Sequence, residues 1–268
     1  MSAPTRAQRV ALMRLQASLS QRELAIIADV ERYRYLSSRQ IEQLHFVVHA
    51  SELTGSRTCR RVLRRLTRLE ALRRLERRIG GVRAGSASFV YALGPVGQRL
   101  LHEDERWRYR YHEPSLDLLE HTLEVAELVV GVKRAAREGA LELLGVETEP
   151  ACWRRFSRGL AGREVLKPDL ALVLGCGEYE YRWYIEIDLA THSPAAVVRK
   201  CHVYHAYWVT GAEQERSGVF PKVLILVPHE RRALLLRRAI ASARHLNAEL
   251  FAVDLLAQAA AHVSEAAS

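Results

Sequence analysis

The sequence predicts a mixed α/β protein, α+β overall, in which an N-terminal winged helix-turn-helix precedes a mixed β-sheet flanked by helices. Two observations support this prediction. Residues 1–112 hold 22 arginines and 10 acidic residues, whereas residues 113–268 hold 18 basic and 21 acidic residues. The apolar pattern also changes, from helices followed by a hairpin to strands that alternate with helices. We therefore expect two domains, residues 1–112 and 113–268.

The composition excludes several classes of protein. With 268 residues, of which 49% are hydrophobic, the chain can bury a sizeable core, so wholesale disorder is not expected. No apolar run approaches the roughly 18 residues that cross a membrane, and the N-terminus "MSAPTRAQRV" lacks the apolar core of a signal peptide. The four cysteines are scattered without metal-binding spacing. We expect a cytoplasmic protein with reduced thiols.

Residues 20–46 predict the first two helices of a winged helix. Ser20 and Glu23 have the spacing of a capping box, and Ser37 or Ser38 begins the second helix. A third helix, "RTCRRVLRRLTRLEAL", follows the turn "LTGS" with Ser56 as its N-cap. The stretch "LRRLERRIGG" then predicts a strand, "GGVRAGSAS" a wing tip, and "FVYALGPVGQRLL" a returning strand and short helix.

The third helix has one strongly basic face. At 100° per residue, six arginines fall within an arc of roughly 140°, opposite the apolar residues of the same helix. These arginines are Arg57, Arg60, Arg61, Arg64, Arg65 and Arg68. A solvated face is the alternative, but six like charges without an acid repel one another, and a phosphate backbone would neutralise them. We expect this helix to enter the major groove of DNA and Arg83 in the wing to contact the backbone.

The sequence of the second domain predicts the element order α-β-β-α-β-α-β. A helix covers 115–138, and a strand is possible at 141–147. The stretches "VLKPDLALVL" and "YRWYIEIDLA" are then predicted to be strands. Ser193 and Pro194 begin the next helix. "PKVLILV" is a strand of the kind buried on both faces, and a helix and a last strand follow it.

Two acidic residues interrupt the apolar strand "YIEIDLATHS". Because strand side chains alternate, Tyr184, Glu186 and Asp188 share one side of the sheet. If the two strands pair, Asp169 at the start of the preceding strand converges with Glu186. Inward carboxylates need a cation, and Mg²⁺ or Mn²⁺ takes oxygen ligands. The alternative is a solvent face on which Glu186 and Asp188 make salt bridges while Asp169 caps a turn.

The pair "PD" at 168–169, followed by "EID" at 186–188, resembles the PD-(D/E)xK nuclease superfamily. Over most of residues 20–255 the chain is similar to the bacterial replication-relaxation family of plasmids and mobile elements. The stretches that carry this similarity include "RYRYLSSRQIEQLHF", "YALGPVGQRLL", "LKPDLALVL" and "YIEIDLATHS". The resemblance implies that a restriction-endonuclease-like domain follows the winged helix.

The resemblance also implies roles for single residues. Asp169 and Glu186 take the metal-ligand positions, with Glu124 or Glu127 on the preceding helix as a third ligand. Asp188 occupies the position of the motif's lysine, so Lys200 or Lys167 is the replacement. The predicted catalytic set is Asp169, Glu186, Asp188 and Lys200.

A tyrosine nucleophile is a further hypothesis for the same domain. Tyr207 shares a helix flank with Lys200 and is the better placed candidate, whereas Tyr204 points to the core. For both residues the alternative is simple packing.

These features together predict a DNA-binding protein of a plasmid or mobile element that nicks or processes DNA with Mg²⁺ or Mn²⁺. The alternative is a non-catalytic transcriptional or replication regulator in which the nuclease-like domain is degenerate. DNA is the expected partner and a membrane is not. A homodimer and other plasmid replication or transfer proteins are further candidate partners.

Overall fold

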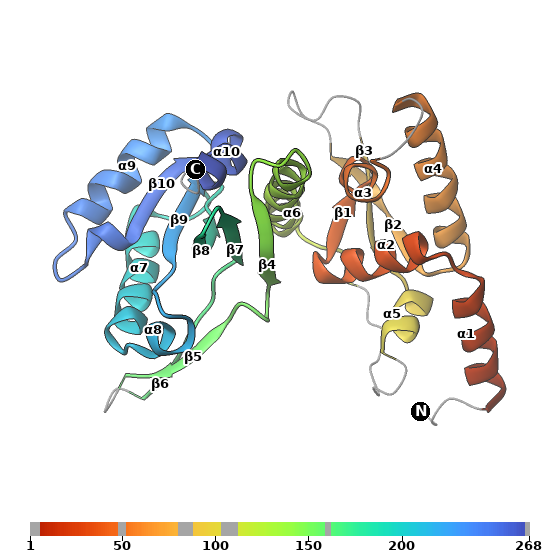
Figure 1. The fold of residues 1–268 in the computed structure, drawn as a ribbon, viewed down its shortest axis with the longest axis horizontal. Coiled ribbons are helices and arrows are strands. Elements are labelled where there is room, and N and C mark those ends of the chain that lie inside the picture. The colour runs from red at the N-terminus through yellow and green to blue at the C-terminus, as the bar shows by residue number, and fades with distance from the viewer. Residues whose placement is uncertain (1–5, 48–51, 80–87, 103–111, 159–161, 266–268) are drawn as a thin grey trace. The chain divides into compact units, whose positions relative to one another are not determined.

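The structure, a computed structural model, describes residues 6–47, 52–79, 88–102, 112–158 and 162–265 (Figure 1). The chain divides into two compact units, Met1–Ala126 and Glu127–Ser268. The division falls within helix α6 (Leu116–Arg137), whereas the predicted boundary at 112/113 lies just before this helix. The first turns of α6 belong to the first unit because Leu119 packs against Leu75 and Val90 there.

The first unit has the winged-helix arrangement that the sequence predicts. Its three strands form an antiparallel sheet in the order β1-β3-β2, with helices α2, α3 and α4 packed against it. Helix α1, which the sequence analysis did not predict, precedes them. The elements before α6 are α1 (Arg6–Ser18), α2 (Gln21–Arg32), β1 (Tyr35–Ser37), α3 (Ser38–His45), α4 (Glu52–Arg68), β2 (Leu72–Ile79), β3 (Ser88–Leu93) and α5 (Pro95–Leu101).

Local capping fixes where α2 and α3 begin. Ser20 and Ser37 each accept a hydrogen bond from the backbone three residues on, and Glu23 and Gln40 return one, so both helices start with a capping box. The expected start of the third helix is wrong. Helix α4 begins at Glu52 and includes the stretch "LTGS", because Ser56 donates its hydroxyl to Glu42 instead of capping the helix.

The second unit is built on a five-stranded mixed sheet in the order β10-β9-β8-β7-β4. β4, β7 and β8 are antiparallel neighbours, whereas β8, β9 and β10 run parallel. This mixed sheet with helices on both faces confirms the predicted mixed α/β class. Its elements are β4 (Glu142–Thr148), β5 (Arg154–Ser157), β6 (Arg163–Leu166), β7 (Leu170–Cys176), β8 (Tyr179–Ile187), α7 (Pro194–Val209), α8 (Ala212–Ser217), β9 (Lys222–Val227), α9 (Glu230–Ala241), β10 (Phe251–Leu255) and α10 (Ala259–Glu265), with short 3₁₀ turns at Ala248–Leu250 and Leu256–Gln258.

Helices cover the sheet on both sides, which leaves its central strands buried. α7 and α9 pack together on one face, where Cys201 and Leu236 share a core cluster with Ile225 of β9 (Figure 1). α10 covers the other face, with His262 against the ring of Trp183 at 5.7 Å between centroids. The sequence "KVLILV" is therefore apolar throughout because β9 lies between two layers of helices.

The stretch between β4 and β7 differs from the prediction. The possible strand at 141–147 is the edge strand β4, and the predicted single strand "VLKPDLALVL" is two strands. β6 ends at Leu166 and β7 begins at Leu170, because Pro168 has no N–H to donate to a ladder. β6 pairs with β5 in a separate two-stranded hairpin that the sequence analysis did not predict. Within the described residues, no helix has both the length and the hydrophobicity that a bilayer crossing requires.

Candidate functional site

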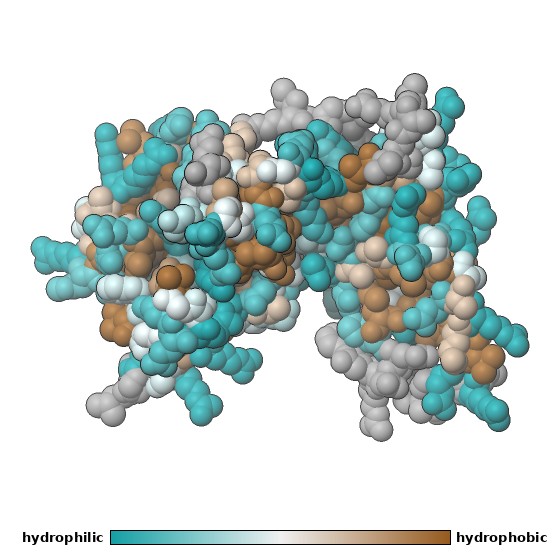
Figure 2. Space-filling model, in the orientation of Figure 1, coloured by the Kyte–Doolittle hydropathy of each residue, from teal (hydrophilic) through white to brown (hydrophobic). Residues whose placement is uncertain are grey.

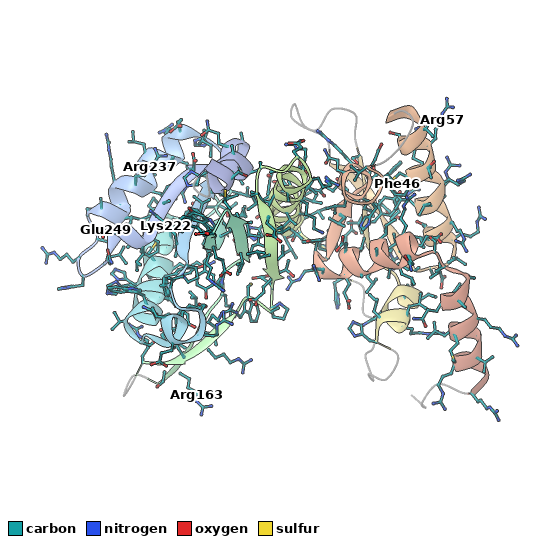
Figure 3. All side chains as sticks on the ribbon, in the orientation of Figure 1. Phe46, Arg57, Arg163, Lys222, Arg237 and Glu249 are labelled. Atoms are coloured by element: carbon teal, nitrogen blue, oxygen red, sulfur yellow. The ribbon has the colours of Figure 1, made fainter. Side chains whose placement is uncertain are left out.

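The six arginines of α4 lie on the exposed side of the helix, opposite its buried side. Cys59, Leu63 and Leu66 are buried, as the predicted helical face requires. All six arginines are classed as exposed, and Figure 3 shows Arg57 pointing away from the unit. Arg65 differs from the others because it contacts the Glu23 carboxylate and donates to the carbonyl oxygen of Ser18 at 3.1 Å. Arg83 lies outside the described residues.

Strand β2 carries two exposed arginines, Arg73 and Arg74, which as consecutive strand residues point to opposite sides of the strand. The Arg74 guanidinium lies over the ring of Phe89, 4.5 Å from its centroid. Burial raises the pKa of Tyr91, and the positive charges of Arg74 and Arg64 oppose that rise. Arg64 of α4 and Arg74 of β2 therefore both lie near Tyr91. Arg74 is not among the DNA-contacting residues that the sequence predicted.

The register of β7 and β8 brings Asp169 and Glu186 together. Leu170 pairs with Ile185, so the residues just outside this pair face each other. The Oδ2 atom of Asp169 accepts the backbone N–H of Ile187 at 2.7 Å. Asp169 is 8% exposed and Glu186 is 7% exposed. The alternative of a solvent-exposed carboxylate face is therefore wrong.

Helix α7 supplies the two partners of Glu186. Lys200 donates its ammonium to Oε2 of Glu186, and Tyr204 donates its hydroxyl to Oε1. Because these residues are four apart, they lie on the same face of the helix. The Lys200 Nζ atom is also 3.8 Å from Oδ1 of Asp169, and its side chain is 41% exposed. The structure thus brings Asp169, Glu186 and Lys200 together, and of these three side chains that of Lys200 is the most exposed.

The charges of this cluster are strongly coupled. Burial raises the pKa of Glu186 above its usual range, and the Asp169 carboxylate adds to the rise, whereas Lys200 and Tyr204 oppose it. Burial lowers the pKa of Lys200, but the two carboxylates outweigh burial and raise it overall. With all three groups ionised, the cluster has one negative charge in excess. The raised pKa of Glu186 means that its carboxyl is protonated more readily than an exposed one.

Asp188 lies just beyond the end of β8 and has a different partner. Its Oδ2 atom accepts from Nη2 and Nε of Arg232 at 2.7 and 3.0 Å, and its Oδ1 atom accepts the backbone N–H of Ala190 at 2.8 Å. Arg232 also donates to the carbonyl oxygen of His192 at 2.7 Å. Asp188 is therefore paired with a buried cation of α9 and not with Lys200, and the pair fixes the loop that leads into α7.

Glu124 lies on the part of α6 that belongs to the first unit, and Glu127 begins the second. Across the described ranges, no three His, Cys, Asp or Glu side chains gather closely enough to hold a metal ion. The second lysine candidate, Lys167, is exposed and lies over the ring of Trp153 at 4.6 Å.

The tyrosines of α7 are buried and hydrogen-bonded, as the packing alternative requires. The hydroxyls of Tyr207 and Tyr184 donate to Oε2 of Glu213 at 2.7 and 2.8 Å. Glu213 also accepts from Arg154 and Arg216. Burial raises its pKa, but the bonds from Arg216, Tyr207 and Tyr184 outweigh burial and lower it to about 2. Burial and the nearby Glu186 raise the pKa of Tyr204 well above its usual value. Neither Tyr204 nor Tyr207 offers an accessible hydroxyl for attack on DNA.

Comparison with known proteins gives one match. The family model described as "Replication-relaxation" matches residues 27–223, which cover both the winged helix and the strands that carry Asp169 and Glu186. No curated protein and no solved structure matches the chain.

The Asp188–Arg232 pair gives a prediction about stability. Arg232→Met leaves a buried carboxylate without its cation, so we expect the free energy of unfolding to fall by about 3–5 kcal/mol in urea denaturation. Arg231→Met is the matched control, because Arg231 is the exposed neighbour on the same helix and its loss costs within about 0.5 kcal/mol. Equal stability of the two variants would show that the pair contributes nothing.

Proposed function

Because the chain belongs to the replication-relaxation family, we propose that it is a DNA-binding protein of a plasmid or mobile element whose second unit cleaves a DNA strand with a divalent metal ion. The observation that carries the cleavage proposal is the cluster of Asp169, Glu186 and Lys200, in which two buried carboxylates meet the ammonium of a lysine whose side chain is partly exposed. Burying such a group of charges is costly, and a structural core of this size has little need of it.

The donor set of the cluster fits Mg²⁺ or Mn²⁺. Mg²⁺ sites commonly use one or two carboxylates and complete their coordination with water and substrate phosphates. Oδ1 of Asp169 faces Lys200 at 3.8 Å, and Oε2 of Glu186 is held by the same ammonium, so these two oxygens point toward one cation. When bound there, the ion would supply an activated water and stabilise charge on the scissile phosphate.

The residues of the chain have separate tasks in this proposal. The backbone N–H of Ile187 and the hydroxyl of Tyr204 hold the carboxylates of Asp169 and Glu186 in place. Before DNA arrives, Lys200 compensates one of the two carboxylate charges of the cluster. Because its side chain is partly exposed, it is able to turn from Glu186 to a phosphate oxygen, where its positive charge is again compensated.

The winged helix supplies the DNA-binding part of the proposal. Five of the six arginines on α4 are exposed without an ion pair to a described acid, and the exposed Arg74 of β2 lies near the same tyrosine as Arg64. The positive charges on such a surface repel one another, and binding to a phosphate backbone would remove this repulsion. Arginine also accounts for every basic residue of residues 1–112, and its planar group suits phosphate contacts.

A second candidate function is a non-catalytic regulator of transcription or replication. The observation that favours it is that two of the acids already have partners in the chain. Glu186 accepts hydrogen bonds from Lys200 and Tyr204, and Asp188 binds Arg232. In this case the second unit would keep the fold of a nuclease and use Lys200 in place of a metal ion.

DNA binding is tested by the salt dependence of affinity. We expect Arg61→Ala combined with Arg64→Ala to weaken duplex binding and to reduce the slope of log K against log[salt] by about 2, because two phosphate contacts are lost. Arg65 is left intact because it also holds Glu23. The charge-matched control is Arg238→Ala with Arg244→Ala, two exposed positions of the second unit. An unchanged slope for the α4 variant would refute its assignment as the DNA-contacting helix.

Cleavage is tested by nicking of supercoiled plasmid with Mg²⁺ or Mn²⁺, measured on agarose gels. Asp169→Asn and Glu186→Gln should each reduce the nicking rate on the order of 100-fold or more, because each removes a metal ligand. Glu215→Gln, at an exposed carboxylate of α8, is the control and should leave the rate unchanged. Absence of nicking by the wild-type protein, with DNA binding intact, would exclude cleavage and favour the regulator.

A further inference from the structure

We propose that the β5–β6 hairpin is a second DNA-binding surface, which holds the phosphate backbone next to the carboxylate–lysine cluster through Arg155, Arg163 and Lys167. This inference rests on the proposed function in that DNA is the ligand in both. It assigns a contact to the second unit, in which acidic residues outnumber basic ones, and nothing in the family assignment or the α4 surface requires it.

The hairpin is locally basic within an acidic part of the chain. Residues 154–167 contain five basic side chains and a single acid, Glu164, whereas residues 113–268 as a whole contain 18 basic and 21 acidic residues. Glu164 is already paired with Arg158 at 3.1 Å. Positive charge is therefore concentrated on this hairpin, although the domain around it has a net negative charge.

The strand register separates the hairpin into a buried and an exposed face. Phe156 and Leu166 lie on the buried face and join a core cluster with Tyr204 and Tyr207 of α7. Phe156 and Tyr207 have ring centroids 5.1 Å apart. One face of the hairpin is thus held against the helix that carries Lys200.

The opposite face of the hairpin carries the cations. Arg155 pairs with Val165 across the hairpin, and Ser157 pairs with Arg163, so these four side chains share the outward face. All four are exposed, and within the described residues neither arginine has an acidic partner. Figure 3 shows Arg163 extending away from the hairpin, and Figure 2 shows hydrophilic side chains at the end of the unit where Figure 1 places β5 and β6. Charged side chains on a fixed, acid-free face fit a polyanion.

Two contacts anchor the hairpin, so its outward face is held in position. Arg154 is nearly buried and binds Glu147 at 2.6 Å and Glu213 at 3.3 Å. Cys152 donates its thiol to the carbonyl oxygen of Pro168 at 3.0 Å. Arg154 therefore serves the fold, and the exposed cations are the ones left for a ligand.

The hairpin leads directly into the candidate cleavage site. Strand β6 ends at Leu166, and Lys167 follows two residues before Asp169. Lys167 lies over the ring of Trp153, which orients the ammonium while leaving the side chain exposed. A backbone phosphate bound at Lys167 would thus lie two positions along the chain from Asp169, a candidate metal ligand.

The test measures DNA affinity against KCl concentration with the full chain carrying Arg155→Ala and Arg163→Ala. The probes are a fluorescein-labelled duplex and a labelled oligothymidine strand. Loss of two phosphate contacts should reduce the salt slope by about 1.8 for the duplex or about 1.4 for the single strand. A change with only one probe identifies the form of DNA that the hairpin holds. Arg155→Lys with Arg163→Lys should keep the wild-type slope because the charges remain.

The outcomes separate this inference from the proposed function. An unchanged slope for the hairpin variant, beside a reduced slope for Arg61→Ala with Arg64→Ala, overturns the hairpin surface and leaves the winged-helix contact intact. A reduced slope for the hairpin variant alone supports the hairpin and overturns the α4 contact. An equal reduction in the Arg238→Ala, Arg244→Ala control shows a general charge effect and overturns the hairpin assignment.

Discussion

The ammonium of Lys200, held between the carboxylates of Glu186 and Asp169, is the interaction on which the second unit depends. Two acids at neighbouring positions of a buried sheet repel each other and lose their hydration, so the arrangement persists only with a cation nearby. Helix α7 supplies that cation and, four residues later, the hydroxyl of Tyr204. The same helix thereby packs on the sheet and compensates one of the two carboxylate charges, through a lysine whose side chain is 41% exposed.

The remaining buried charges of this unit support the position of α7. Arg232 joins Asp188 to the carbonyl oxygen of His192, and so determines how the chain leaves β8 and enters the helix. At the other end, Glu213 collects hydrogen bonds from α7, β8 and the β5–β6 hairpin. Buried ion pairs contribute little net stability compared with apolar packing, so their value here lies in specifying geometry.

Local sequence patterns predicted much of the fold, and distant partners limited the rest. The capping boxes at Ser20 and Ser37 and the arginine face of α4 follow from spacing alone and are present in the structure. Part of the site could be predicted from the sequence, because strand alternation and strand pairing bring Asp169 and Glu186 together. No spacing rule identifies Arg232 as the partner of Asp188, 44 residues away. The hairpin was missed because Pro168 interrupts an apolar run that reads as one strand.

The central claim is that the Asp169–Glu186 pair can exchange the Lys200 ammonium for a divalent ion when DNA is present. The most direct measurement is a Mn²⁺ titration of the full chain with a short DNA duplex, followed by electron paramagnetic resonance of the free ion. The account predicts one Mn²⁺ bound per chain for the wild-type protein, and loss of that ion in Asp169→Asn. Equal Mn²⁺ binding by the two proteins, or none by the wild type, would contradict it.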